Sequence, residues 1–162
     1  MNDYQIPLRT RIGHVHLKVA DLQRSLDFYC GLLGFEVTMM YGDQAAFISA
    51  GGYHHHIGLN TWFSKDGIPP LERNTGLFHT AIVYPERKDL AVILQRLQEN
   101  DYPLTGAADH GVSEALYLDD PDENGVELYW DRPKDKWPLK EDGSIDMYTR
   151  RLDLTNLLSE CD

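Results

Sequence analysis

Histidine is the residue type whose distribution in this chain of 162 residues most suggests chemistry. All seven histidines lie between positions 14 and 110, and three of them, His54 to His56, are consecutive. Imidazole titrates near neutral pH and is a common metal ligand, so this concentration suits acid–base catalysis or metal binding. Two histidines open similar segments, HVHLKVAD from His14 and HTAIVYPE from His79. We interpret this weak repeat as two copies of one supersecondary unit.

The first unit is predicted to have the order β-α-β-β-β. Alternating apolar residues predict a strand over 12–19. A helical stripe follows, with Asp21 as its N-cap and Gly34 at its end. Glycines mark the turns between three further predicted strands, over 35–40, 45–50 and 54–60.

The second unit repeats that order. A strand is predicted over 77–84 and a helix over 86–99, where leucines recur at helical spacing. Three short strands follow, over 103–107, 114–119 and 125–131. The acidic run DDPDENG at 119–125 has turn composition, and it lacks the spacing of a calcium loop, so we expect a solvated turn.

The predicted organisation is α+β, with two tandem units that form a curved, barrel-like mixed sheet. The divisions are an N-terminal segment over 1–10, the first unit over 11–62, a linker over 63–75, the second unit over 76–131 and a tail over 132–162. The tail is charged and is expected to wrap the domain or a partner subunit. Its segment MYTRRLDLTNLL is expected to contain a short helix.

Strand alternation selects three side chains that could bind a metal. In each unit's first strand the apolar residues share one face, which leaves His14 and His79 on the opposite face. In the last strand, Glu127 opposes an apolar face in the same way. Two imidazoles and one carboxylate form the facial set of non-haem Fe(II), and the same set can bind Mn(II) or Zn(II). A single strand histidine is more often an ordinary hydrogen-bonded residue, so the repeat is what favours a metal site.

The motifs resemble the vicinal oxygen chelate superfamily, which contains glyoxalase I, extradiol catechol dioxygenases, fosfomycin-resistance enzymes and bleomycin-binding proteins. The resemblance covers residues 11–131, and its opening and closing motifs are HVHLKVADLQRSLDFYCGLLGFEV and DPDENGVELYW. It implies the glyoxalase/extradiol dioxygenase fold, and it implies that His14, His79 and Glu127 are the metal ligands.

The segments GGYHHHIGLNTW and DHGVSEALYLDDPDENGVELYW resemble the extradiol ring-cleaving branch. That resemblance implies an acid–base role for His55 near the oxygen site. It also implies that His110 lies near the substrate and that Tyr117 donates a hydrogen bond to a catecholate oxygen. These residue types suit the chemistry, because histidine can hold and deliver a proton and a phenol can stabilise an anionic oxygen. The implied metal is Fe(II), with Mn(II), Zn(II) or Ni(II) as alternatives, and the implied substrates are a small aromatic and O2.

Two other functions stay open. A glyoxalase I-type isomerase normally uses a further carboxylate late in the first unit, where this chain reads HHHIGLN. A non-enzymatic binder of an aromatic metabolite or drug would normally lack the three metal ligands. Tyr117 could also be an ordinary core aromatic.

Composition narrows the possible partners. The formal net charge of −11 repels phosphate backbones, so nucleic acid is an unsuitable partner. Two cysteines, Cys30 and Cys161, are too few for a disulfide scaffold. No apolar run has the length of a membrane span and the N-terminus lacks a signal-peptide core, so we expect a cytoplasmic protein that does not bind membranes. Relatives with one pair of units often dimerise, so a homo-oligomer is expected.

Overall fold

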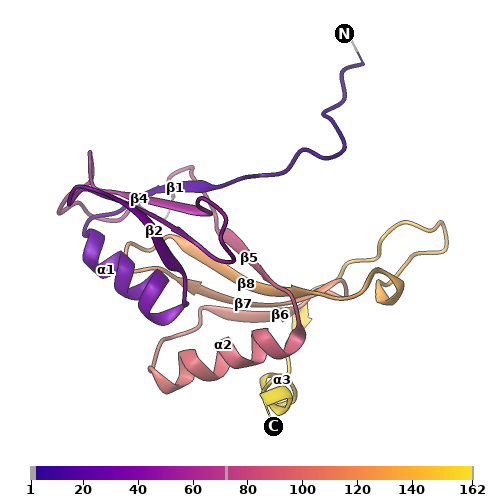
Figure 1. Cartoon of the computed structure of the whole chain (residues 1–162). Helices are drawn as coiled ribbons and strands as arrows, with labels where there is room; N and C mark the ends of the chain where they lie inside the picture. The colour runs from indigo at the N-terminus through magenta and orange to yellow at the C-terminus, as the bar shows by residue number, and fades with distance from the viewer. Residues whose placement is uncertain (1–2, 72, 162) are drawn as a thin grey trace.

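Two mixed sheets, each with helices against one side, make up the fold (Figure 1). The structure is a computed structural model that describes residues 3–71 and 73–161. The predicted α+β class is confirmed. Parts of three predicted segments fall outside the described residues: positions 1–2 of the N-terminal segment, position 72 of the linker and position 162 of the tail.

The first sheet contains four strands in the order β1-β4-β3-β2, with β1 and β4 parallel and the other pairs antiparallel. Helix α1 continues into π-helical turns over Asp27–Leu32. The Asp21 side chain caps α1 by accepting a hydrogen bond from the Arg24 N–H. The elements are β1 (Val15–Lys18), α1 (Leu22–Leu26), β2 (Glu36–Tyr41), β3 (Ala45–Ser49) and β4 (Ile57–Asn60).

The second sheet repeats this order as β5-β8-β7-β6 and adds the tail strand β9 at its edge. The elements are β5 (Thr80–Tyr84), α2 (Arg87–Glu99), β6 (Gly106–Asp109), β7 (Ser113–Asp119), β8 (Gly125–Asp131), β9 (Arg150–Arg151) and α3 (Leu154–Leu158). The repeated β-α-β-β-β order is therefore confirmed. The two sheets remain separate among the described residues, so they do not close into a barrel.

Four strands, β1, β4, β5 and β6, begin three residues later than predicted. The parallel ladders start at Val15 opposite Ile57 and at Thr80 opposite Val126. The residues that precede Val15 and Thr80 pair with no residue of these ladders. The sequence pattern of apolar residues nevertheless continues there, which is why the strands were predicted to begin earlier. His14, the 54–56 histidine run and His79 consequently lie immediately before strands, where side chains can reach past the end of the sheet.

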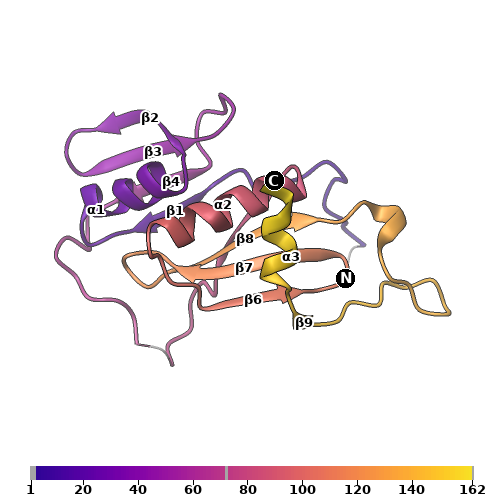
Figure 2. The same ribbon diagram turned by 90° about the horizontal axis from the view of Figure 1, so that it is seen from below.

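The two units share one hydrophobic core. Helices α1 and α2 lie side by side beneath the sheets (Figure 2). Buried residues from both units form a single cluster, which includes Leu17, Tyr29, Leu94 and Leu128. Arg96 of α2 donates hydrogen bonds to the carbonyls that end the first unit's helix, at 2.7 Å and 2.6 Å. The relative placement of the units is therefore held by buried contacts.

The acidic turn before β8 joins the two units, so the prediction of a solvated turn is wrong. Asp120 and Asp122 are both buried. Asp120 accepts a hydrogen bond from the Tyr29 hydroxyl at 3.0 Å, and Asp122 forms an ion pair with Arg24. Asp122 also accepts from the Ala20 N–H at 3.2 Å. Buried carboxylates require such partners, and here the turn's own Asn124 supplies some of them while Tyr29, Arg24 and Ala20 of the other unit supply the rest.

The tail packs against the second unit. Strand β9 pairs with β6, and the predicted short helix is confirmed as α3, which packs on α2. Arg87 of α2 donates to Glu114, Glu160 and Asn156, which joins α2, β7 and the tail. None of the helices in the described part of the chain is both long and apolar enough to cross a membrane.

Replacing Leu157 with alanine is expected to destabilise the protein by about 2–4 kcal/mol, because a fully buried leucine leaves a cavity. Urea unfolding followed by circular dichroism measures this loss. Leu139→Ala is the matched control, since Leu139 is largely exposed and should change stability by less than about 0.5 kcal/mol. Equal effects of the two substitutions would show that α3 does not contribute to the core.

Candidate active site

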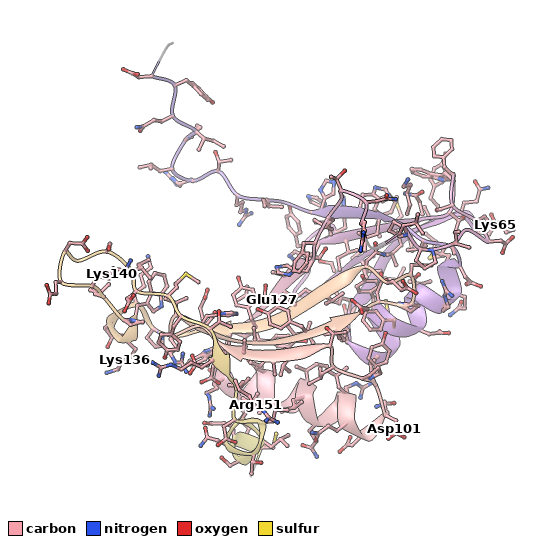
Figure 3. All side chains as sticks on the ribbon, turned by 180° about the vertical axis from the view of Figure 1, so that it is seen from behind. Lys65, Asp101, Glu127, Lys136, Lys140 and Arg151 are labelled. Carbon is pink, nitrogen blue, oxygen red and sulfur yellow. The ribbon has the colours of Figure 1, made fainter. Side chains whose placement is uncertain are left out.

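The second unit places an imidazole against a carboxylate. His79 Nε2 lies 3.0 Å from Glu127 Oε2. Val126 and Leu128 of β8 are buried against the core, so Glu127 between them projects to the opposite side. Figure 3 shows Glu127 on the side of the sheet away from the helices. Strand alternation positions Glu127 on this side, and His79 reaches the same side from the residue just before β5.

Tyr117 extends the pair into a hydrogen-bonded series. Tyr117 of β7 is the ladder partner of Glu127, and its hydroxyl donates to Glu127 Oε1 at 3.0 Å. His110 Nε2 lies 2.8 Å from the same hydroxyl. Burial, with the hydrogen bond to Glu127 and its charge, raises the pKa of Tyr117 to about 12. Tyr117 therefore keeps its proton at neutral pH and acts as a donor.

The tail holds the other side of the His110 ring. His110 Nδ1 lies 3.2 Å from the Tyr148 carbonyl and 3.2 Å from the Thr149 hydroxyl. A carbonyl can only accept, so the bond to Tyr148 puts a proton on Nδ1 and directs Nε2 toward Tyr117. This contact had no signal in the sequence, because the tail lacks a recognisable motif.

A cavity of about 370 Å³ opens beside this series. Its lining combines apolar groups with a few polar ones, as is typical of sites for small organic molecules. The lining residues are Phe78, His79, Thr105, Gly106, Tyr117, Leu118, Asp119, Gly125 and Val126.

The first unit forms a separate histidine cluster. The rings of His14 and His55 lie 4.3 Å apart between centroids, and Phe47 packs against His55 at 5.0 Å. His54 Nδ1 and His55 Nδ1 are 2.7 Å apart, so one ring donates and the other accepts. Burial and the neighbouring histidines, chiefly His14 and His54, lower the pKa of His55.

Strand alternation does not set the directions of the three consecutive histidines. His54 to His56 precede β4, so their directions are set by local contacts rather than by alternation. His54 consequently lies beside His55 and shares a hydrogen bond with it. His56 instead lies 3.0 Å from the Ser49 hydroxyl through Nδ1.

The three predicted metal ligands are not brought together within the chain. Across residues 3–71 and 73–161, no three His, Cys, Asp or Glu side chains lie close enough to hold one metal ion. His79 and Glu127 supply two donors of the predicted set, whereas His14 contacts His55 instead. His79 Nδ1 is buried without a hydrogen-bond partner among the described residues. The second unit therefore supplies two of the three ligands of a facial metal site.

Comparison with known proteins agrees with this architecture. The sequence pattern of the Glyoxalase/Bleomycin resistance protein/Dioxygenase superfamily matches residues 11–128. The chain belongs to this superfamily. Members of known structure confirm the fold: a glyoxalase/dioxygenase from Nostoc punctiforme superposes with a TM-score of 0.64 at 19% identity, covering 82% of this chain and 99% of that one.

Two curated relatives from this superfamily are dioxygenases by name. The catechol-2,3-dioxygenase of Bacillus subtilis (strain 168) is 43% identical over 93% of this chain and 52% of its own length. The biphenyl-2,3-diol 1,2-dioxygenase 3 of Rhodococcus globerulus is 32% identical over 75% of this chain and 63% of its own length. The chain thus spans between about half and two thirds of the length of these two relatives.

The Tyr117 hydroxyl is expected to titrate near 12, because burial and Glu127 both disfavour the phenolate. In Glu127→Gln the pKa should fall toward the ordinary value of about 10, since the carboxylate charge is removed. NMR of protein labelled with ¹³C-tyrosine measures both values, and Tyr117→Phe identifies the resonance. An unchanged pKa in Glu127→Gln would contradict the hydrogen bond between these side chains.

Gly125→Ala is expected to displace His79 from Glu127. A Cβ at position 125 would lie 2.2 Å from the Phe78 carbonyl oxygen, which is backbone and cannot rotate away. Overpacking of this kind costs about 1–3 kcal/mol. Urea unfolding measures the cost, and NMR of the His79 ring reports its displacement. Gly76→Ala is the control, because nothing lies within 4 Å of its Cβ position; similar behaviour of the two variants would refute the explanation.

Proposed function

We propose that this chain is a metal-dependent extradiol dioxygenase, which opens the ring of a catechol-type aromatic with O2. The observation that carries the proposal is the unbroken series from His79 through Glu127 and Tyr117 to His110 beside one cavity. The similarity to dioxygenases of catechol and biphenyl-2,3-diol supports the same class of reaction.

His79 and Glu127 would hold the metal, with His14 as the third ligand. Two imidazoles and a carboxylate leave positions open for other ligands, and we propose Fe(II) as the ion. When bound, Fe(II) supplies the Lewis acidity that lowers the pKa of a catechol hydroxyl and the redox capacity that O2 requires. Mn(II) is the nearest alternative for this set of donors.

Tyr117 is proposed to recognise the catecholate. Its single hydroxyl proton is donated to Glu127 in this structure. A substrate oxygen that took the place of Glu127 in that hydrogen bond would receive the same proton, and this would stabilise negative charge on the substrate. His110 Nε2 lies on the other side of the hydroxyl, and the tail fixes its ring, so the position of the Tyr117 oxygen is held before substrate arrives.

His55 is proposed as the acid–base residue. Its lowered pKa keeps the ring neutral at pH 7, so it can accept a proton and later return it. The reaction balances without an external reductant. The ring bond adjacent to the diol breaks, and the two atoms of O2 enter the product as an aldehyde oxygen and a carboxylate oxygen.

A glyoxalase-type isomerase has less support from the site. The strand that would carry its further carboxylate is β4, which reads Ile-Gly-Leu-Asn. Asn60 at its end has its side-chain amide directed at the Leu17 carbonyl. This strand therefore offers no carboxylate.

Anaerobic loading with Fe(II), followed by a panel of substituted catechols, tests the proposal. We expect O2 uptake and the absorbance of a ring-opened semialdehyde in equal amounts. Tyr117→Phe should lower kcat by about 100-fold, because one donor to a developing anion is lost. Tyr84→Phe is the matched control, since Tyr84 lies on the core side of β5. Absence of O2 uptake with every catechol would refute the dioxygenase proposal.

A further inference from the structure

The cavity beside the second-unit cluster, which consists of His79, Glu127, Tyr117 and His110, has a wall of one sign of charge. Among the described residues that line it, none is a lysine or an arginine. Asp119 contributes a carboxylate to the lining, and the imidazole of His79 is already a proposed metal ligand. Away from the metal position, the charge of the cavity wall is therefore negative.

Strand alternation puts the Asp119 side chain on the same face as the second-unit cluster. Asp119 follows Tyr117 by two residues in β7, a separation of about 7 Å along the strand. Leu118 between them is buried in the core, so its two neighbours project to the other side. In the ladder Tyr117 is opposite Glu127, whereas Asp119 is opposite Gly125. No side chain from β8 therefore faces the Asp119 carboxylate.

The Asp119 carboxylate also has no basic partner in residues 3–71 and 73–161. None of the ion pairs formed within these ranges includes it. Arg24, which is bound at the adjacent acidic turn, pairs with Asp122 instead. Asp119 is exposed, so its charge is accessible to a molecule in the cavity.

Phe78 is a second feature of the cavity that favours a cation. It lines the same cavity and is 88% exposed. Its ring lies 5.4 Å from the ring of His79, between centroids, so it stands beside a proposed metal ligand. The face of an aromatic ring attracts an ammonium group through its quadrupole. Phe78 and Asp119 thus favour the same charge on a bound molecule.

The cavity is open beside Tyr117 because the residue across from it is a glycine. Gly106 of β6 is the ladder partner of Tyr117 and lines the cavity. A Cβ at position 106 would have the Tyr117 side chain as its nearest neighbour, at 3.6 Å. This opening leaves room for a substituent on an aromatic ring whose hydroxyls meet Tyr117.

We propose that this cavity selects catechols by the charge of the ring substituent, favouring one that bears an ammonium group over one that bears a carboxylate. The inference rests on the proposed dioxygenase function. With the diol at Tyr117 and the metal, a substituent directed along β7 lies near Asp119, which attracts an ammonium group and repels a carboxylate. A carboxylate substituent would also lack the arginine or lysine that usually binds such a group, since the described lining has neither.

Three catechols with side chains of similar length test this selection: dopamine, 4-ethylcatechol and 3,4-dihydroxyphenylacetate. Isothermal titration calorimetry of the protein with Fe(II) and without O2 gives a Kd for each, because turnover is prevented. Dopamine is expected to bind about 10-fold more tightly than 3,4-dihydroxyphenylacetate, since attraction of one and repulsion of the other add. 4-Ethylcatechol should lie between them. The difference should shrink at about 1 M NaCl, where the Debye length is about 3 Å.

Asp119→Asn should bring the Kd values for dopamine and 3,4-dihydroxyphenylacetate to within about 2-fold of each other, because the charge is removed from the cavity. Asp101→Asn is the matched control. It removes the same charge from an exposed residue with a φ of 51°, which asparagine tolerates. Figure 3 shows Asp101 near the end of α2, on the helix side of the sheet, and Glu127 on the other side. This control should keep the wild-type ratio, and circular dichroism establishes that both variants fold.

Four outcomes would overturn the charge selection: equal binding of the three catechols, tighter binding of the acid, a ratio unchanged in Asp119→Asn, or no binding of any catechol. A loss of the ratio in Asp101→Asn would also overturn it, since net charge would then explain the preference. O2 uptake with the same compounds separates the two proposals. A charge preference without O2 uptake refutes the dioxygenase and keeps the selection, whereas O2 uptake without a preference does the reverse.

Discussion

The alternation of side chains along β-strands is the constraint on which the rest of this structure depends. Each sheet buries one face under its helix, and that face is filled by residues such as Leu17, Val126 and Leu128. The intervening residues must then project to the other side. Glu127 lies there for this reason, and His79 reaches the same side from the residue just before β5. The apolar core and the reactive face are thus two consequences of one pattern.

The shared hydrophobic core keeps the reactive residues of the two units apart. Helices α1 and α2 are packed together, and the buried Asp120 links the turn before β8 to Tyr29 of the first unit. A more open arrangement would break this buried hydrogen bond and expose the shared apolar core to water, which is unfavourable. The units are therefore fixed relative to one another, and the two histidine clusters are kept apart within one chain. The contacts that stabilise one chain therefore do not bring its proposed metal ligands together.

Hydrogen bonding sets the chemistry of the second cluster. Tyr117 stands between an acceptor, Glu127, and a ring, His110, which is itself held by the tail carbonyl of Tyr148. A phenol in this setting keeps its proton to about pH 12, and its oxygen is held between Glu127 and His110. The tail is distant from the site in sequence, yet it fixes the His110 ring that contacts this hydroxyl. Its charged composition gave no indication of this role.

The sequence by itself determined the order of elements, the duplicated unit and the faces of His79 and Glu127, because these follow from local periodicity and repetition. It also indicated Tyr117, through its motif. It did not determine the burial of the acidic turn, the tail's contact with His110 or the directions of the 54–56 histidines, since these depend on partners distant in the chain or on backbone outside a strand. The separation of His14 from Glu127 was decided only by tertiary structure, because alternation gives the face of a residue but not the packing of one sheet against the other.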